Sequence, residues 1–418
     1  MLNNNYICAL DIGSSKIAVC LAEIKKRRVS NLFFDCIASK GVKDGVVTDS
    51  ISLITAIGSL LKSLKAKTGI NIKYLHTNIS GQDIVSKHSR AIIPLAERGN
   101  KVITVSDIQH VNEQARVLGS SLEEDIIHVI PSSYTIDSKS NISNPIGLYS
   151  HRLEVDLYLI CGKLSSVQTL SRVVHQAGFD IKGLSFSGLA TCKAVLGKGF
   201  KDGVHVFCDI GSDITEIMIF KAGLLKEIEI LQLGGNNLTA QLQEVLKVPF
   251  ELAEDIKRSY GVIGDAAQIA EDKEILVKKS DFYKPIKQRL VSEVITSGAK
   301  LICSQIKEAI EKKVPLYEIN NFVVVGRTVL IEGLMETLES AMGIPVKLGR
   351  ISNPEIVELI KENSELAGQK YLTYLTPIGM ICETLEAKPI GILPLHQPAK
   401  RLLTKAVNRV KEVYQEYF

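Results

Sequence analysis

Two widely separated segments of the chain repeat the same pattern of residues. The first is ALDIGSSKIAVCLAEI, beginning at Ala9, and the second is FCDIGSDITEIMIFKA, beginning at Phe207. Each has an apolar run, then Asp-Ile-Gly-Ser, then a run of alternating apolar residues that is typical of a half-buried strand. We therefore expect a β-hairpin with a polar, glycine-containing turn in each segment. A duplication of this kind predicts two related halves rather than one continuous core.

The residues at these two turns suit a phosphate group and a magnesium ion. Gly13 and Gly211 let backbone N–H groups come close to a ligand, and successive N–H groups in a turn form a concave anion site. Asp11 and Asp209 end the apolar strands, where we expect each carboxylate to hold Mg²⁺ through water. A single such turn is also an ordinary hairpin turn, but two in register favour phosphate binding. The other candidate ligands at the two turns are Ser14, Ser15, Lys16, Ser212, Asp213 and Thr215.

The paired loops resemble those of the superfamily that contains actin, sugar kinases and heat-shock chaperones. In that superfamily two such hairpins face each other across a cleft and grip the nucleotide phosphates, so the resemblance implies ATP and Mg²⁺ as ligands. Gly234 and Gly235 lead into a predicted helix with Asn236 as its expected N-cap. The resemblance places this turn near the nucleoside.

The next predicted helix, ELAEDIKRSYG, carries Glu254 and Lys257 three residues apart on one face. By resemblance this pair lies near the ribose and adenine; the alternative is a solvated ion pair. The superfamily then has a strand ending in two or three glycines against the base, whereas this chain keeps only Gly326, followed by Arg327 and Thr328. We expect Arg327 either to stack on the adenine or to crowd it.

The stretch from about Gly81 to Cys161 interrupts the first half with strand-like flanks and a helical pattern preceded by Ser106, which predicts an inserted α+β subdomain. Its segments HVIPSSYTID and NPIGLYSHRLEVDLYLI resemble the FtsA family, the actin-related cell-division proteins of bacteria. The match is carried by His128, Pro131, Tyr134, Asp137, Pro145, Gly147, Arg152, Leu153 and Glu154.

This resemblance predicts the fold class, an α/β actin-like ATPase built from two ribonuclease-H-like cores. We expect the first core at 1–80 and 161–199, the inserted subdomain at 81–160, the second core at 200–245 and 315–396, and a smaller lobe at 246–314. By resemblance the protein polymerises, and the smaller lobe docks the C-terminal peptide of the tubulin-like division protein FtsZ. Because the sequence shows no assured general base, we expect at most a slow ATPase, with Asp11 or Asp209 acting through magnesium-bound water.

The segment 397–418 predicts an amphipathic C-terminal helix. Five basic and two acidic side chains share its polar face, which suits the headgroups of an anionic membrane. The FtsA resemblance implies the same anchor; the alternative is a helix packed on its own domain. The residues expected to contact lipid are Lys400, Arg401, Leu402, Leu403, Lys405, Val407, Arg409, Val410, Val413, Tyr414, Tyr417 and Phe418.

Composition limits the remaining function classes. No apolar run approaches the roughly 20 residues of a membrane span, and the N-terminus does not resemble a signal peptide, so we expect a cytoplasmic protein peripheral to the inner face of the membrane at the division septum. The net charge of +4 gives no argument for nucleic acid, and eight scattered cysteines without a CxxC pair do not predict zinc. Alternative functions are a pilus-assembly actin homologue, a nucleotide-dead scaffold and a small-molecule kinase.

Overall fold

The computed structural model describes residues 5–96, 99–197, 200, 202–264, 274–279, 282–363, 366 and 368–386. The predicted tail helix at 397–418, with all of its expected lipid contacts, lies outside the described residues. Within them, no helix is both long and apolar enough to cross a bilayer.

The first half is built on a five-stranded sheet in the order β13-β6-β1-β2-β3. The first repeat forms its central hairpin, in which β1 and β2 pair antiparallel while β6 runs parallel to β1 on the other side. The alternating apolar residues of β2 are buried between helices on the two faces of the sheet. The strands of this sheet are β1 (Asn5–Ile12), β2 (Lys16–Lys25), β3 (Arg28–Ala38), β6 (Tyr74–Ile79) and β13 (Asp180–Phe186). The helices of this half are α1 (Ser50–Thr68), α3 (Leu164–Gln176) and α4 (Ser187–Val195). Two short strands, β4 (Val42–Lys43) and β5 (Val46–Val47), pair with each other.

The second half repeats this topology, with a five-stranded sheet in the order β16-β15-β14-β19-β20. The second repeat forms its β14–β15 hairpin, and β19 runs parallel to β14 as β6 does to β1. The strands are β14 (Val204–Ile210), β15 (Thr215–Lys221), β16 (Leu224–Leu231), β19 (Ile319–Val325) and β20 (Val346–Leu348), with the short turns η2 (Leu316–Glu318) and η3 (Arg327–Leu330) beside β19, and α8 (Leu334–Met342) before β20.

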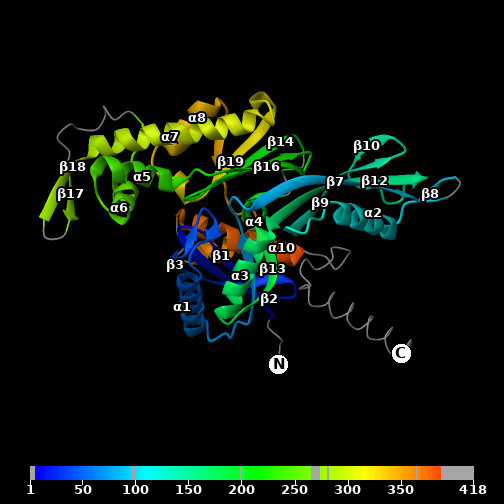
Figure 1. Cartoon of the computed structure of the whole chain (residues 1–418), viewed down its shortest axis with the longest axis horizontal. Coiled ribbons are helices and arrows are strands. Elements are labelled where there is room, and N and C mark those ends of the chain that lie inside the picture. The colour runs from blue at the N-terminus through cyan, green and yellow to red at the C-terminus, as the bar shows by residue number, and fades with distance from the viewer. Residues whose placement is uncertain are drawn as a thin grey trace.

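Two smaller lobes project in opposite directions from the two cores (Figure 1). The lobe of the second half contains α5 (Gly235–Leu246), α6 (Phe250–Tyr260), the long α7 (Gln288–Glu311), and a hairpin of β17 (Glu274–Lys279) and β18 (Phe282–Lys287). The inserted subdomain of the first half has a four-stranded sheet in the order β10-β9-β12-β7 with its own hydrophobic core. Its elements are β7 (Ile84–Pro94), β8 (Lys101–Val102), α2 (Val105–Leu118), β9 (Glu124–Ile136), β10 (Lys139–Ile142), β11 (Tyr149–Ser150) and β12 (Arg152–Lys163).

The helix of the inserted subdomain begins earlier than the sequence pattern predicted. Its N-cap is Thr104, and Ser106 already lies inside α2. Thr104 and Asp107 form a reciprocal capping box, in which each side chain accepts a hydrogen bond from the backbone N–H of the other. The capping pair outcompetes a lone serine because it satisfies two backbone donors at once.

The end of the described chain crosses back to the first half. Helix α9 (Pro354–Glu362) contacts β3, and η5 (Lys370–Tyr374) contacts β2. The last helix, α10 (Leu375–Glu386), packs on α4, β1 and β6. The predicted second core at 315–396 therefore includes a segment that packs against the first core. The apolar residues of α10 could not reveal this in the sequence, because periodicity identifies a buried face but not the surface that buries it.

Candidate nucleotide-binding site

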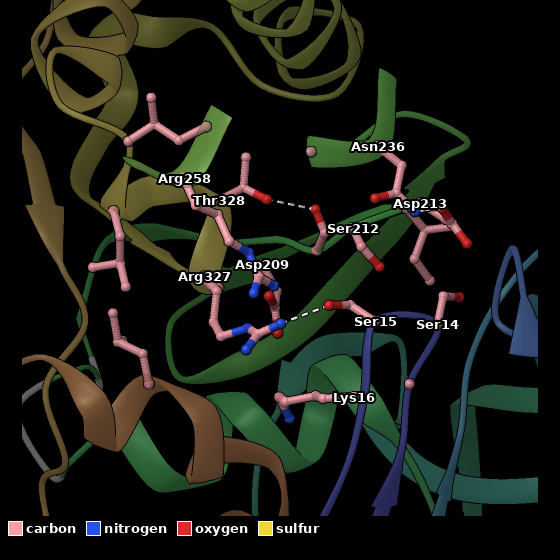
Figure 2. A pocket seen from close by; sticks show the side chains of 18 of the residues that line it. Ser14, Ser15, Lys16, Asp209, Ser212, Asp213, Asn236, Arg258, Arg327 and Thr328 are labelled. Atoms are coloured by element: carbon pink, nitrogen blue, oxygen red, sulfur yellow. Dashed lines mark hydrogen bonds between the residues drawn. The ribbon is translucent and has the colours of Figure 1, made fainter. Parts of the chain in front are cut away.

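A cleft of about 630 Å³ separates the two halves, and both Asp-Ile-Gly-Ser turns line it. The first turn enters from the β1–β2 hairpin and the second from the β14–β15 hairpin, so the duplicated segments face each other (Figure 2). The predicted residues that line the cleft are Asp11, Gly13, Ser14, Ser15, Lys16, Asp209, Gly211, Ser212, Asp213, Gly235, Asn236, Glu254, Lys257, Gly326 and Arg327.

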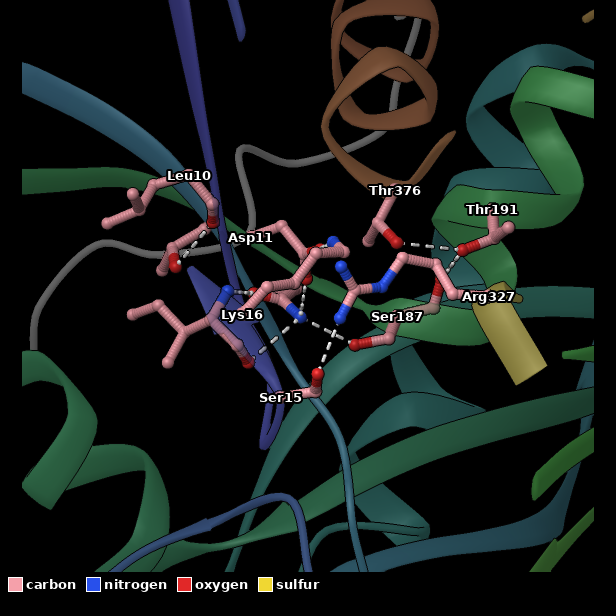
Figure 3. Close-up of polar contacts among 11 residues, drawn as sticks. Leu10, Asp11, Ser15, Lys16, Ser187, Thr191, Arg327 and Thr376 are labelled. Carbon is pink, nitrogen blue, oxygen red and sulfur yellow. Dashed lines mark hydrogen bonds and ion pairs between the residues drawn. The ribbon is translucent and has the colours of Figure 1, made fainter. Parts of the chain in front are cut away.

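The first turn is held by a network around Asp11. Gly13 N donates to Lys16 O at 3.0 Å and closes the turn. Lys16 Nζ forms an ion pair with the Asp11 carboxylate. Asn78, at the end of the neighbouring strand β6, donates to Asp11 Oδ1 at 2.9 Å and to Ser187 Oγ at 2.8 Å (Figure 3). The Asp11 side chain is therefore fixed in direction, and its negative charge is compensated within its own turn.

The second turn closes with the same backbone hydrogen bond but has carboxyl groups and no basic residue of its own. Gly211 N donates to Ile214 O at 2.9 Å. Burial, with a further contribution from the charge of Asp11, raises the pKa of Asp209 to about 6. Burial and the charge of Asp209 raise the pKa of Glu216 to about 8, and Ser80 of the first half donates a hydrogen bond to it. Glu216 is consequently protonated at neutral pH, whereas Asp209 is largely ionised.

Asp213 joins the two halves. Its Oδ2 accepts from Asp44 N of the first half at 2.8 Å, and its Oδ1 accepts from Asn236 Nδ2 at 2.6 Å. The next residue along the first half, Gly45, donates its N–H to Ser14 Oγ at 3.1 Å. These bonds bring both turns and the start of α5 into one network at the mouth of the cleft.

The start of α5 differs from its prediction. Its N-cap is Gly234, and Asn236 is the second helical residue. Asn237 Oδ1 accepts from Gly234 N at 2.8 Å and so supplies the capping contact. A Cβ on Gly234 would lie 2.6 Å from Gly211 O, so this glycine lets the helix start pack on the second turn.

The Glu254–Lys257 pair is not a solvated ion pair. Lys257 is 6% exposed, its Nζ lies 2.6 Å from Glu254 Oε2, and it donates to Gly235 O at 2.9 Å and to Thr239 Oγ1 at 2.8 Å. Burial lowers the pKa of Lys257, and the charge of Glu254 acts in the opposite direction. The pair fixes the beginning of α5 against α6 at the wall of the cleft.

Arg327 reaches across the cleft from the second half. Gly326 ends β19 with a φ of +96°, a conformation that favours glycine, and a Cβ there would lie 2.2 Å from Ile210 O. The following Arg327 donates from Nη2 to Ser15 Oγ in the first turn at 2.6 Å (Figures 2 and 3). Thr328 Oγ1 donates to Gly211 O at 2.8 Å, which anchors the Arg327 backbone to the second turn.

Thr215 does not line the cleft. It is fully buried, and its hydroxyl donates to Leu233 O at 2.7 Å. Thr215 is the first residue of β15. The predicted Gly234 is likewise behind the cleft wall and not part of its lining.

The sequence analysis missed several lining residues. Those at the end of β6, on α4 and at the beginning of α10 come from segments far from any predicted site residue. The three others are next to predicted residues, because Glu216 follows Thr215, Arg258 follows Lys257 and Thr328 follows Arg327. The missed residues include Asn78, Ser80, Ser187, Thr191, Glu216, Arg258, Thr328, Leu375 and Thr376.

The donor set fits a magnesium nucleotide. Two carboxylates, Asp11 and Asp209, face the same cleft from opposite halves, and Mg²⁺ is usually held by one or two carboxylates together with water and phosphate oxygens. Gly13 and Gly211 carry close-packed turns beside them, where a larger residue would meet backbone oxygens. Lys16 and Arg327 supply cationic donors on the two sides.

Comparison with known proteins identifies both the insert and the second half. Residues 81–161 match the family described as the SHS2 domain inserted in FtsA, and residues 206–372 match the family described as cell division protein FtsA. Cell division protein FtsA of Streptococcus pneumoniae is 27% identical over 92% of this chain and 83% of its own length. The FtsA of Borreliella burgdorferi is 26% identical over 83% of this chain and 85% of its own length.

Solved structures support the fold alone, because their sequence identity is low. The chain superposes on a structure of the PilM–PilN type IV pilus biogenesis complex with a TM-score of 0.62, at 16% identity over 91% of this chain and 98% of the other. The ethanolamine utilization protein EutJ of Carboxydothermus hydrogenoformans gives a TM-score of 0.51, at 16% identity over 91% and 90% of the two chains. The predicted α/β actin-like fold with an inserted subdomain is confirmed. This chain belongs to the FtsA family of actin-like cell-division proteins.

Proposed function

We propose that the protein binds MgATP in the cleft, polymerises, and tethers FtsZ filaments to the inner face of the cytoplasmic membrane at the division septum. The observation that carries this proposal is the meeting of two duplicated Asp-Ile-Gly-Ser turns across one cleft in a chain of the FtsA family. Bound nucleotide contributes phosphate oxygens that both turns can hold at once. Nucleotide binding thereby favours the closed arrangement of the halves.

Different groups of the cleft would bind the phosphates and the metal ion. We propose that the backbone N–H groups of the two turns and the Lys16 ammonium bind phosphate oxygens, and that Asp11 and Asp209 hold Mg²⁺ through water. We propose that hydrolysis, where it occurs, is slow. Glu216 carries a proton at neutral pH because its pKa is about 8, and Asp209 is the carboxylate best placed to accept one.

The membrane part of the proposal rests on the sequence of the tail. Its apolar residues fall on one side of the expected helix, and its polar side carries five basic and two acidic residues. A helix of this composition binds anionic lipid through buried apolar area and through electrostatic attraction. We further propose that the 246–314 lobe receives the C-terminal peptide of FtsZ, as the family resemblance implies.

Liposome co-sedimentation tests the proposal. The full chain and a 1–398 truncation are mixed with anionic vesicles and with neutral vesicles, each with and without MgATP. We expect only the full chain to pellet with anionic vesicles, and to do so more completely with MgATP because assembly adds avidity. Pelleting of both forms, or of neither, would remove the tail as the anchor and would favour a scaffold that acts away from the membrane.

A further inference from the structure

The cleft contains four basic side chains, and one of them differs from the others in its partner. Lys16 pairs with Asp11, and Lys257 and Arg258 both pair with Glu254. In the described part of the chain, no carboxylate lies within ion-pair distance of Arg327, and its hydrogen bond goes to the neutral hydroxyl of Ser15.

This arrangement leaves a partly desolvated positive charge in the cleft. Arg327 is half-buried, and burial together with the nearby charge of Arg258 lowers its pKa, while the carboxylates of Glu254 and Asp11, which lie beyond ion-pair distance, act in the opposite direction. An arginine stays protonated even so, because its unperturbed pKa is so high. A partly buried charge without a direct ion-pair partner is unfavourable, so an anion that enters the cleft gains from the guanidinium more than from a cation that is already paired.

The backbone around Arg327 has little freedom to move away from this place. Gly326 packs so closely on Ile210 that a Cβ does not fit, and Thr328 is bonded to Gly211 of the second turn. Only the long side chain crosses to the first half, where it ends at Ser15 (Figure 3). The guanidinium thus contacts the first turn, while the backbone that carries it is anchored to the second turn, and both turns line the same cleft.

We propose that Arg327 binds a phosphate oxygen of the nucleotide, and that it neither stacks on the base nor blocks it. This inference rests on the proposed nucleotide binding. A phosphate oxygen is a charged acceptor and forms a stronger hydrogen bond with arginine than a serine hydroxyl does. Because Arg327 belongs to the second half and Ser15 to the first, a phosphate held by both links the occupancy of the cleft to its closure.

Binding constants for ATP, ADP and adenosine distinguish a contact of Arg327 with phosphate from stacking on the base and from blocking of the site. They are measured by calorimetry or by competition with a fluorescent nucleotide, with Mg²⁺, on the full chain and its Arg327→Gln and Arg327→Lys variants. We expect Arg327→Gln to lose about 10- to 100-fold in affinity for ATP and ADP while adenosine changes less than about twofold. Arg327→Lys should recover part of the loss, because it restores the charge without the planar fork.

The matched control is Arg289→Gln, which removes an arginine from the surface of α7, where it pairs with Glu293. Thermal unfolding of each variant separates a binding effect from a folding effect. An equal loss for adenosine and ATP would show that Arg327 stacks on the base, and unchanged or tighter ATP binding would show that it crowds the site; either result overturns the inference. If the unaltered chain binds none of the three ligands, the proposed nucleotide binding fails as well.

Discussion

The two Asp-Ile-Gly-Ser turns share a backbone but differ in charge. Both close with a hydrogen bond from the glycine N–H to a carbonyl three residues later, at 3.0 Å in the first and 2.9 Å in the second, and both hairpins sit in sheets of the same strand order. In the first turn Lys16 compensates Asp11. In the second hairpin Asp209, Asp213 and Glu216 lie together with no lysine or arginine between them.

The two turns have therefore kept the same backbone geometry, whereas the charges of their side chains differ. A turn with its own cation suits the phosphate, whereas a turn rich in carboxyl groups suits a metal ion and exchangeable protons. The raised pKa values of Asp209 and Glu216 reflect the same contrast, since burial in the second half is not offset by a cation of its own turn. The two turns therefore face one cleft with the same backbone geometry and different charges.

The largest expected effect comes from removing the cation of the first turn. In Lys16→Met we expect the affinity for MgATP to fall about 10- to 50-fold, since a hydrogen bond to a charged group contributes about 1.5–3 kcal/mol and Lys16 is already paired with Asp11. Calorimetric titration measures the change. Lys26→Met, at the exposed turn between β2 and β3, is the control and should bind like the unaltered chain. Unchanged MgATP binding in Lys16→Met would show that the cation of the first turn does not distinguish the two turns in nucleotide binding.

The second prediction concerns the proton on Glu216 and its effect on how the free energy of unfolding changes with pH. The folded protein keeps this proton up to about pH 8, whereas an ordinary glutamate loses it near pH 4.5, so stability falls as pH rises between these values. We expect Glu216→Gln, which needs no proton, to be more stable than the unaltered chain by about 2 kcal/mol at pH 6 and nearly unchanged at pH 4.5. Thermal unfolding without Mg²⁺ at the two pH values measures it.

The control for Glu216→Gln is Glu244→Gln, on the exposed surface of α5, which should show no difference between the two pH values. A Glu216→Gln variant that is destabilised equally at both pH values would contradict a protonated Glu216. It would indicate instead that the ionised carboxylate holds Ser80 and with it the two halves.

The smallest effect compares the two glycines of the turns. A Cβ added to Gly211 would lie 2.8 Å from Ile214 O, whereas a Cβ added to Gly13 would lie 3.3 Å from Lys16 O. We expect Gly211→Ala to lose about 1–2 kcal/mol of unfolding free energy and Gly13→Ala less than about 1 kcal/mol, since overpacking against backbone forces a shift. Urea unfolding of both variants measures the difference, and equal or reversed losses would show that the two backbones are not packed as described.

The sequence predicted the parts of the site that are local and repeated. Asp11, Gly13, Asp209 and Gly211 were identifiable because two copies of one motif confirm each other. Asn78 and Thr376 were not, because single polar residues at the end of a strand or the start of a helix carry no sign of which cleft they enter. The sequence could place Arg327 after its strand, but only the structure shows that its partner is Ser15.

The predictions for single residues failed where neighbouring alternatives competed. Asn236 looked like a helix cap, but Asn237 makes the capping contact with Gly234. Thr215 looked like a phosphate donor, but it is the first residue of a strand and points inward to Leu233. For Asn236 a shift of one residue at the start of α5 decides which side chain makes the cap. For Thr215 the hydroxyl is already bonded to a backbone carbonyl in the interior, which a sequence pattern does not reveal.

The return of the chain to the first half has a mechanical consequence. Helix α10, twelve residues and so about 18 Å long, begins at the cleft beside Thr191 and ends at the ion pair of Glu386 with Lys193, on the first half throughout. The last described residue, Glu386, therefore lies on the first half. With the proposed anchor in the tail, the first half would be the part held at the bilayer, and the second half would be joined to it across the cleft. Closure of the cleft on the proposed nucleotide would then change the angle between the 246–314 lobe and the plane of the membrane.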